Sequence, residues 1–101
     1  MFSIKPGLIN IKFCILENYV RGEVNTNICP VSGKLILTED TCKLAAQEFG
    51  GDYKSSGSWS STPKGCYTYT DGAYKGNYYW NTHAIGSSKT KVQPICAKRG
   101  W

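Results

Sequence analysis

The chain has little of the chemistry that most enzymes and metalloproteins use. Its 101 residues include one histidine, His83, and only seven Asp or Glu residues, none of which form a recognisable catalytic pair. No G-x-S-x-G or G-K-[ST] motif is present, and the C-x-x-C spacing of zinc and redox sites is absent. We therefore expect no enzymatic activity, no metal and no cofactor; a Cys14–His83 dyad is a minor alternative.

Long apolar runs are also lacking. Residues Met1–Leu16 are rich in apolar side chains, but Lys5, Pro6, Asn10 and Lys12 interrupt them before they reach the length of a signal peptide or a membrane span. We expect no transmembrane segment. The segment instead alternates between apolar and polar residues, which predicts a strand with one buried face. Its apolar positions are Ile9, Ile11, Phe13 and Ile15.

Positive charge is present without being concentrated. Twelve Lys or Arg residues and seven acidic residues give a net charge of +5, and the basic residues are spread from Lys5 to Arg99. Nucleic-acid-binding proteins gather such charge in a patch or stripe, so we expect no nucleic-acid partner. Long-range attraction to an acidic polysaccharide or to membrane headgroups is left open.

Five cysteines stand out against these absences. Four of them, at positions 29, 42, 66 and 96, are widely spaced, which predicts two long-range disulfides and an oxidising compartment. Such a location requires an export signal that has been removed, or a natural start other than Met1. The fifth, Cys14, is expected to be buried and free; a bond to another chain or a place in the main framework are the alternatives.

The pattern along the chain predicts an α+β fold, with one helix packed on a small, mainly antiparallel sheet. Thr38 is a suitable N-cap, the apolar positions from Cys42 to Phe49 recur at helical spacing, and Gly50 and Gly51 provide the stop. Residues 17–27 are expected to form a polar connection, and Ser55–Pro63 a loop. Strands are predicted at 28–31 or 34–37, at Cys66–Thr70, at Asn77–Thr82 and at Val92–Lys98.

Two disulfide patterns follow from these elements. Cys42 shares the apolar face of the helix, where a strand beginning at Cys66 would pack, so the preferred pattern is Cys42–Cys66 with Cys29–Cys96. The alternative is Cys29–Cys42 with Cys66–Cys96. We divide the chain into an N-terminal strand and connection, residues 1–27, and a cysteine-bridged module, residues 28–101.

Aromatic side chains are dense between positions 59 and 80, where they offer flat apolar faces with polar tips. Core and cross-strand packing is the alternative role for each of them, and Trp80 and Cys66 are expected to be buried. The predicted binding residues are Trp59, Tyr67, Tyr69, Tyr74, Tyr78, Tyr79 and Asn81.

Four short motifs occur in a characteristic order: Thr38–Ala46 with a cysteine before two alanines, Pro63–Tyr67 (PKGCY), Tyr79–His83 (YWNTH) and Gln93–Cys96 (QPIC). This succession resembles a cysteine-bridged module of secreted or surface proteins in marine invertebrates and unicellular algae. The resemblance covers about Cys29 to Lys98. It implies an extracellular, disulfide-linked module and assigns it no activity.

A looser likeness is to C-type lectin-like domains, whose chains also end in a strand with a cysteine followed by a basic residue. Their calcium and sugar site would correspond to Gln93–Ile95 and Trp80–Thr82. Both triplets lack the terminal carboxylate or amide that a hard cation needs as ligand. The resemblance therefore does not carry calcium-dependent sugar binding to this chain.

Two functions remain. The first is a disulfide-stabilised binding or structural module, in the extracellular space or a secretory lumen, that docks to a protein partner or a larger assembly. The second is a carbohydrate-binding module that uses exposed Tyr and Trp side chains to hold a glycan.

Overall fold

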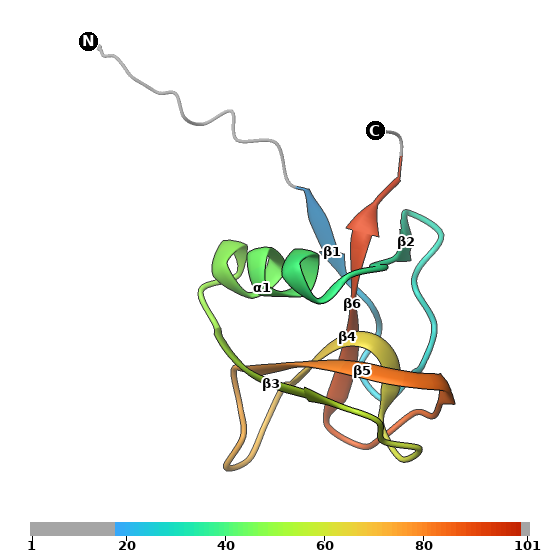
Figure 1. The fold of residues 1–101 in the computed structure, drawn as a ribbon, viewed down its shortest axis with the longest axis vertical. Coiled ribbons are helices and arrows are strands. Elements are labelled where there is room, and N and C mark those ends of the chain that lie inside the picture. The colour runs from blue at the N-terminus through green and yellow to red at the C-terminus, as the bar shows by residue number, and fades with distance from the viewer. Residues whose placement is uncertain (1–17, 100–101) are drawn as a thin grey trace, which may run out of the picture.

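The structure is a computed structural model that describes residues 18–99. The predicted strand at positions 9–15 and Cys14 lie outside this range. Within it, one helix and six strands follow one another along the chain (Figure 1). They are β1 (Tyr19–Arg21), β2 (Gly33–Leu35), α1 (Glu39–Glu48), β3 (Asp52–Gly57), β4 (Pro63–Tyr69), β5 (Asn77–Gly86) and β6 (Val92–Lys98).

The strands form one sheet in the order β1-β6-β4-β5-β3. The last strand, β6, is paired on one edge with β1 and on the other with β4, and β2 continues that second edge beyond the end of β4. These pairs and β4–β5 are antiparallel, whereas β3 runs parallel to β5. The predicted α+β fold with a mainly antiparallel sheet is confirmed, and the parallel edge strand was not predicted.

Strand β3 corrects the expectation that Ser55–Pro63 is a loop. Residues Ser55–Gly57 belong to β3 and Pro63 begins β4, which leaves residues 58–62 as the connection. The side chains of β3 are mostly exposed because the strand lies at the edge of the sheet. Without a buried face, the strand lacks the apolar alternation by which strands are recognised.

Residues 17–27 were expected to be a connection, yet β1 lies within them. It has only three residues and pairs Tyr19, Val20 and Arg21 with Ala97, Cys96 and Ile95 of β6. So short a strand gives no periodic signal. Residues 18–27 therefore share the sheet that the cysteine-bridged module forms.

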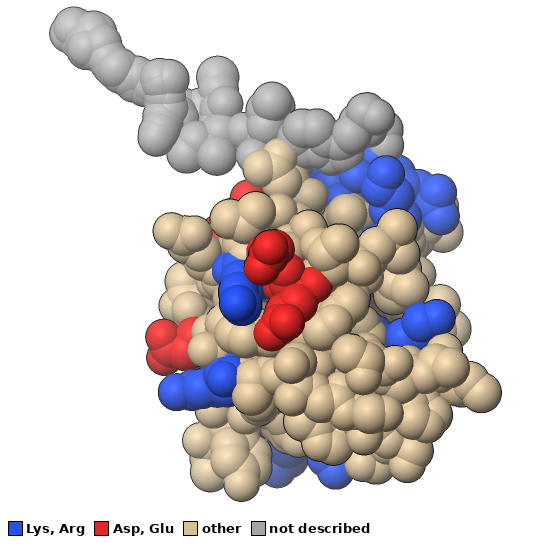
Figure 2. All heavy atoms as spheres, in the orientation of Figure 1, with Lys and Arg blue, Asp and Glu red and all other residues tan. Residues whose placement is uncertain are grey.

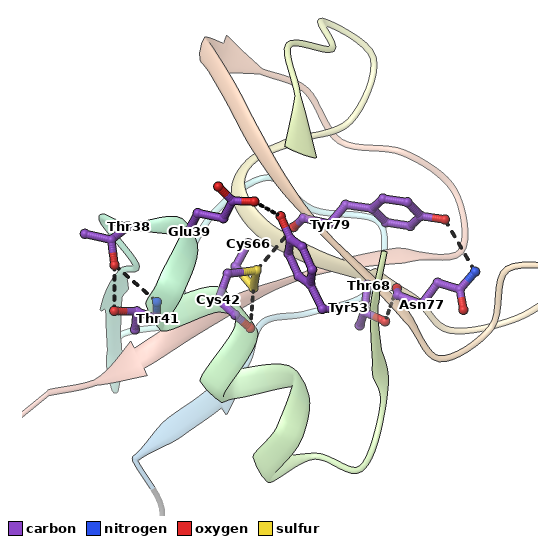
Figure 3. Close-up of a disulfide and its surroundings, with 9 residues drawn as sticks. All are labelled: Thr38, Glu39, Thr41, Cys42, Tyr53, Cys66, Thr68, Asn77 and Tyr79. Carbon is purple, nitrogen blue, oxygen red and sulfur yellow. Dashed lines mark hydrogen bonds between the residues drawn. A yellow bond between two sulfur atoms is a disulfide. The ribbon is translucent and has the colours of Figure 1, made fainter. Parts of the chain in front are cut away.

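The helix begins and ends as the sequence predicts. The Thr38 side chain accepts a hydrogen bond from the backbone N–H of Thr41 at 3.2 Å, which satisfies one of the free donors of the first turn (Figure 3). Glu39 accepts a hydrogen bond from the hydroxyl of Tyr53 on β3. At the other end, Gly50 adopts φ +74°, a conformation that glycine reaches without strain.

The hydrophobic core lies between α1 and one face of the sheet. Its buried members are Ile36, Cys42, Ala45, Ala46, Cys66, Tyr78 and Ile95. Cys66 is buried as expected, whereas Trp80 is only partly buried and packs at the side of this cluster. The two alanines let the helix approach the sheet closely, so the large buried side chains of the core come from the sheet and from Ile36 in the segment before the helix.

Both disulfides of the preferred pattern are present. Cys42–Cys66 links the helix to β4 with 5.4 Å between the Cα atoms (Figure 3). Cys29–Cys96 links the segment before β2 to β6 with 5.9 Å between the Cα atoms. Within residues 18–99, α1 is the sole helix, and its ten residues are too short and too polar to cross a bilayer.

Candidate binding site: an aromatic groove

The two faces of the sheet carry different side chains because strand residues alternate in direction. The register places Cys66 opposite Trp80 and Ile95, on the face that packs against the helix. The next residue, Tyr67, is opposite Tyr79 and Pro94, so these side chains lie on the other face. No helix of residues 18–99 covers that second face.

A groove lies on this second face, with a volume of about 330 Å³. Strands β4 and β5 provide its floor, and the segments before β4, before β5 and before β6 provide its walls. We call it the aromatic groove. Its lining residues are Trp59, Ser61, Thr62, Tyr67, Tyr69, Tyr74, Tyr79 and Lys89.

The rings of the groove contact one another at steep angles. Tyr67 and Tyr79 are stacked across the strands, with centroids 5.3 Å apart and planes at 23°. Trp59 stands edge-on to both of them, at 85° and 88°, and Tyr74 lies against Tyr69 at 58°. Edge-to-face pairs of this kind are favourable because of the ring quadrupole. The result is a hollow with walls and not a flat platform.

Depth in the groove increases from Tyr74 to Tyr67. Tyr74 is 56% exposed at the rim, Tyr69, Tyr79 and Trp59 are partly buried, and Tyr67 is 3% exposed at the base. Burial raises the pKa of Tyr67 to about 12 and also raises the pKa of Tyr69. Both hydroxyls are therefore neutral at physiological pH, where each can donate or accept a hydrogen bond.

Charge at the groove comes from one side chain. Lys89 is the single charged residue in the lining, and no Asp or Glu of residues 18–99 contributes to it. A metal ion or a cationic ligand would find no carboxylate there. The groove therefore suits an uncharged ring or aliphatic group, and Lys89 can pair with a negatively charged group beside it.

Trp59 is held in place by Asn81 of β5. The Asn81 side-chain oxygen accepts hydrogen bonds from the backbone N–H groups of Trp59 at 2.9 Å and of His83 at 3.1 Å. Its side-chain nitrogen faces the carbonyl oxygens of Trp59, Thr62 and Pro63 at 2.8–3.1 Å. At 1% exposure, Asn81 has no side-chain surface to offer a ligand, but it fixes the loop that carries the Trp59 ring.

Gly57, at the end of β3, leaves the space that the Trp59 ring occupies. A Cβ atom at this position would lie 2.4 Å from the Trp59 ring, closer than any carbon contact allows. Only a residue without a side chain leaves the indole where it is. The position of Trp59 thus depends on a glycine from one strand and an asparagine from its neighbour.

Five of the seven predicted binding residues meet in the groove: Trp59, Tyr67, Tyr69, Tyr74 and Tyr79. The other two do not. Tyr78 points to the opposite face, where it is 4% exposed in the core, and Asn81 is the buried residue described above. Both had been selected because they lie beside the other aromatic residues in the sequence.

Three lining residues had not been predicted. Ser61 and Thr62 belong to the Trp59 loop, and their nearness to an aromatic residue was the only available signal. Lys89 lies nine positions beyond the aromatic segment, and the sequence shows it only as half of the Lys89/Lys91 pair. Its approach to the groove is a consequence of the turn between β5 and β6.

His83 has a local structural role. Its Nδ1 atom accepts hydrogen bonds from the backbone N–H groups of Ile85 at 3.2 Å and Gly86 at 2.8 Å. These two hydrogen bonds organise the end of β5. The possible partner in a catalytic pair, Cys14, lies outside the described residues.

The groove offers a bound group ring faces, hydroxyls and one cation. No Asp, Glu, His or Cys of residues 18–99 lines it. In a ligand pocket, rings of this kind provide contact area and polar tips provide orientation. Comparison of the chain with protein-family models, with curated proteins and with solved structures finds no match.

Proposed function

We propose that this chain is a non-catalytic, disulfide-stabilised binding module of the extracellular space or secretory lumen, and that it docks to a protein partner through the aromatic groove. The observation that carries the proposal is the ring geometry. Near-perpendicular walls around a hollow accept a protruding side chain, such as an aromatic or aliphatic residue on a partner's loop. Tyr and Trp are the residue types that contribute most binding energy in such contacts.

The exposure of the groove supports this role. Tyr74 is 56% exposed although it contacts Tyr69, and Trp59 keeps part of its ring accessible. Burying the remaining apolar surface of these rings on binding contributes about 25 cal/mol per Å². The rings are already packed against one another, so little side-chain entropy is lost when a partner binds.

The two disulfides support an oxidising location. Cys42–Cys66 and Cys29–Cys96 are the arrangement expected of small secreted domains and are rare in reducing compartments. They also make the sheet a rigid support for the groove. The resemblance to cysteine-bridged modules of secreted and surface proteins agrees with this proposal.

Carbohydrate binding is the second candidate. Ser61, Thr62 and the tyrosine hydroxyls provide donors and acceptors around the rings. However, a flat row of exposed, coplanar rings would favour a sugar most. Among residues 18–99 the only near-parallel pair is Tyr67–Tyr79, and Tyr67 is buried at the base. The protein partner is therefore the preferred ligand.

Site-specific photo-crosslinking of the full chain tests the proposal. A benzophenone side chain introduced at Tyr74 should form a covalent adduct with one defined protein in native secretions, and the additional change Trp59→Ala should abolish it. The matched control places the same group at Leu44, which is 55% exposed on α1, away from the groove. An adduct that forms equally from position 44, or that persists without the Trp59 ring, would contradict docking through the groove.

A glycan array distinguishes the second candidate. Binding of the purified chain to defined glycans, lost in Trp59→Ala and retained in Leu44→Ala, would replace the protein partner with a sugar. Unchanged melting temperatures in both variants are required, since only then does lost binding report on the groove.

A further inference from the structure

A second hollow lies on the other side of the turn between β4 and β5. It has a volume of about 260 Å³ and is enclosed by β1, the C-terminal end of α1 and residues 70–76. We call it the basic cleft. Its side-chain lining includes Arg21, Phe49, Thr68, Lys75, Tyr78 and Gln93. Tyr69 is the one residue that it shares with the aromatic groove.

The guanidinium group of Arg21 is held in a defined orientation at this cleft. Its central carbon lies 4.2 Å from the centroid of the Phe49 ring, a distance typical of a cation–π contact. The same group lies against the hydroxyl of Tyr78, whose ring is 4% exposed. An arginine fixed by a ring and a hydroxyl presents its planar set of N–H donors in one direction.

Lys75 places a second positive charge at the cleft. It belongs to the β4–β5 turn, where its backbone N–H donates to the carbonyl of Gly72 at 3.2 Å. None of the lining residues is Asp or Glu, so no carboxylate of residues 18–99 reaches into the cleft to neutralise the two cations. Two like charges that share one hollow repel each other, and a bound anion removes that repulsion.

The glycines of the cleft hold its shape. Gly51 lies so close to the buried Tyr78 ring that an added Cβ would be 2.3 Å from it. Gly50 and Gly76, which also line the cleft, adopt φ values of +74° and +84°, a conformation that glycine reaches without strain. The cleft is therefore a formed feature of the fold and not a gap between mobile side chains.

We propose that the basic cleft binds an oxyanion group, sulfate or phosphate, between Arg21 and Lys75, with the Tyr78 hydroxyl as an additional donor. Arginine binds the oxygens of such groups through two parallel N–H bonds, and lysine adds a point charge. On the face seen in Figure 2, one group of basic side chains gathers at the upper right, and the other basic groups lie apart from it around the acidic group near the centre.

The site does not depend on the aromatic groove or on its partner. The groove uses rings and a single lysine, whereas the cleft uses a fixed arginine and a lysine on the opposite side of the turn. A variant whose groove binds no partner should still bind the oxyanion. A variant whose cleft binds no oxyanion should still bind the partner.

The test is an NMR titration of the full chain with sodium sulfate and with sodium phosphate, at an ionic strength kept constant with sodium chloride. We expect saturable shifts of the backbone amides around the cleft. Arg21→Gln and Lys75→Gln should each weaken binding at least fivefold. Lys54→Gln is the matched control, because Lys54 is exposed on β3 and does not line the cleft; it should leave the affinity unchanged.

Arg21→Lys separates a shaped site from simple charge attraction. It keeps the charge but loses the planar donors, so a site that uses them should bind at least threefold more weakly. Substitution of Arg21 can disturb the packing of Phe49. Lys75 is exposed in a turn, so Lys75→Gln should fold normally and tests the site independently of that packing. Non-saturating shifts, or equal losses in Lys54→Gln and Lys75→Gln, would overturn the proposal.

A second comparison identifies the source of the oxyanion. A sulfated disaccharide should bind in the same cleft more tightly than its desulfated counterpart if the group belongs to a larger ligand. Binding of the free ions with no gain from the disaccharide would show that the site takes a free anion. Failure of both the ions and the disaccharide would overturn the site.

Discussion

At the scale of single residues, Asn81 shows that a residue beside the groove residues in the sequence can have a purely structural role. Its neighbours in the sequence are rings of the groove and the core, yet both polar ends of its own side chain are used inside the molecule. A buried amide with this many partners stabilises a loop because each partner would otherwise lack a hydrogen bond. Its influence on the groove passes through the position of Trp59.

Replacing Asn81 by alanine should lower the free energy of unfolding by about 2–4 kcal/mol, because several buried backbone groups lose their partner together. Chemical denaturation measures the loss. Asn77→Ala is the matched control, since that side-chain nitrogen makes one bond, to the Tyr79 hydroxyl at 3.4 Å, and should cost less than about 1 kcal/mol. Equal losses in the two variants would show that Asn81 does not hold the loop.

Tyr67 should make stability depend on pH in the alkaline range. Burial raises its pKa in the folded chain to about 12, above the ordinary value of 10.0. The folded state therefore retains the proton more tightly. The contribution of the protonated Tyr67 to the free energy of unfolding is complete below about pH 10. It is lost as the pH rises toward 12, by up to about 1.4 kcal/mol per pH unit.

Two measurements check this pH dependence. Tyrosinate absorbance should show one late-titrating tyrosine fewer in Tyr67→Phe than in the wild type, in which the pKa values of Tyr53, Tyr69 and Tyr78 are also raised. The alkaline loss of stability should be shallower in the same variant. Tyr74→Phe, at the exposed rim, is the control. A wild-type titration indistinguishable from that of Tyr67→Phe would refute the effect of burial.

At the scale of elements, β3 and the Trp59 loop control the shape of the groove from the edge of the sheet. Gly57→Ala should displace the indole ring, because the new Cβ would lie 2.4 Å from it while the ring itself can turn away. We expect altered near-ultraviolet circular dichroism and weaker ligand binding. Since β3 is an edge strand, the loss of stability should stay near 1 kcal/mol.

Ser56→Ala serves as the control for Gly57→Ala, because it changes an exposed position on the same strand. Its spectrum and binding should match those of the wild type. An unchanged Trp59 environment in Gly57→Ala would show that the indole does not need the glycine.

The sequence predicts the elements that have a buried face and misses those that do not. The helix from Thr38 to Gly50 was predicted from caps and spacing, and the aromatic strands from alternation. The missed strands, β1 and β3, are short or exposed edge strands whose pairing depends on distant segments. Lys89 and the basic cleft were missed for the same reason, since residues from separate parts of the chain form each site.

At the scale of the whole molecule, the two disulfides differ in how accessible they are. Cys42 and Cys66 are 0% and 1% exposed between helix and sheet, whereas Cys29 is partly accessible. A reductant must reach a sulfur atom to attack it. Mild reduction followed by alkylation should therefore label Cys29 and Cys96 before Cys42 and Cys66, as peptide mass mapping can show.

Loss of either bridge should cost about 3–4 kcal/mol, with the larger loop of Cys29–Cys96 at the upper end. Replacing each pair by alanine and measuring unfolding in denaturant gives the two values. Labelling of all four cysteines at one rate under mild reduction would mean that the reductant acts only after global unfolding, contrary to the expected order.

Strand β6 has a consequence for how the chain is made. It is the last of the described elements to be synthesised, yet β1, β2 and β4 all pair with it. Cys96 is synthesised 67 positions after Cys29, its disulfide partner. At a ribosomal rate of about 5–20 residues per second, that interval is on the order of 3–13 s. During it, Cys29 is an available thiol, and the cysteines nearest to it in the sequence are Cys42 and Cys14, with Cys66 next. Accurate pairing therefore depends on the helix and β4 engaging first, so that Cys42 and Cys66 have already bonded when β6 arrives.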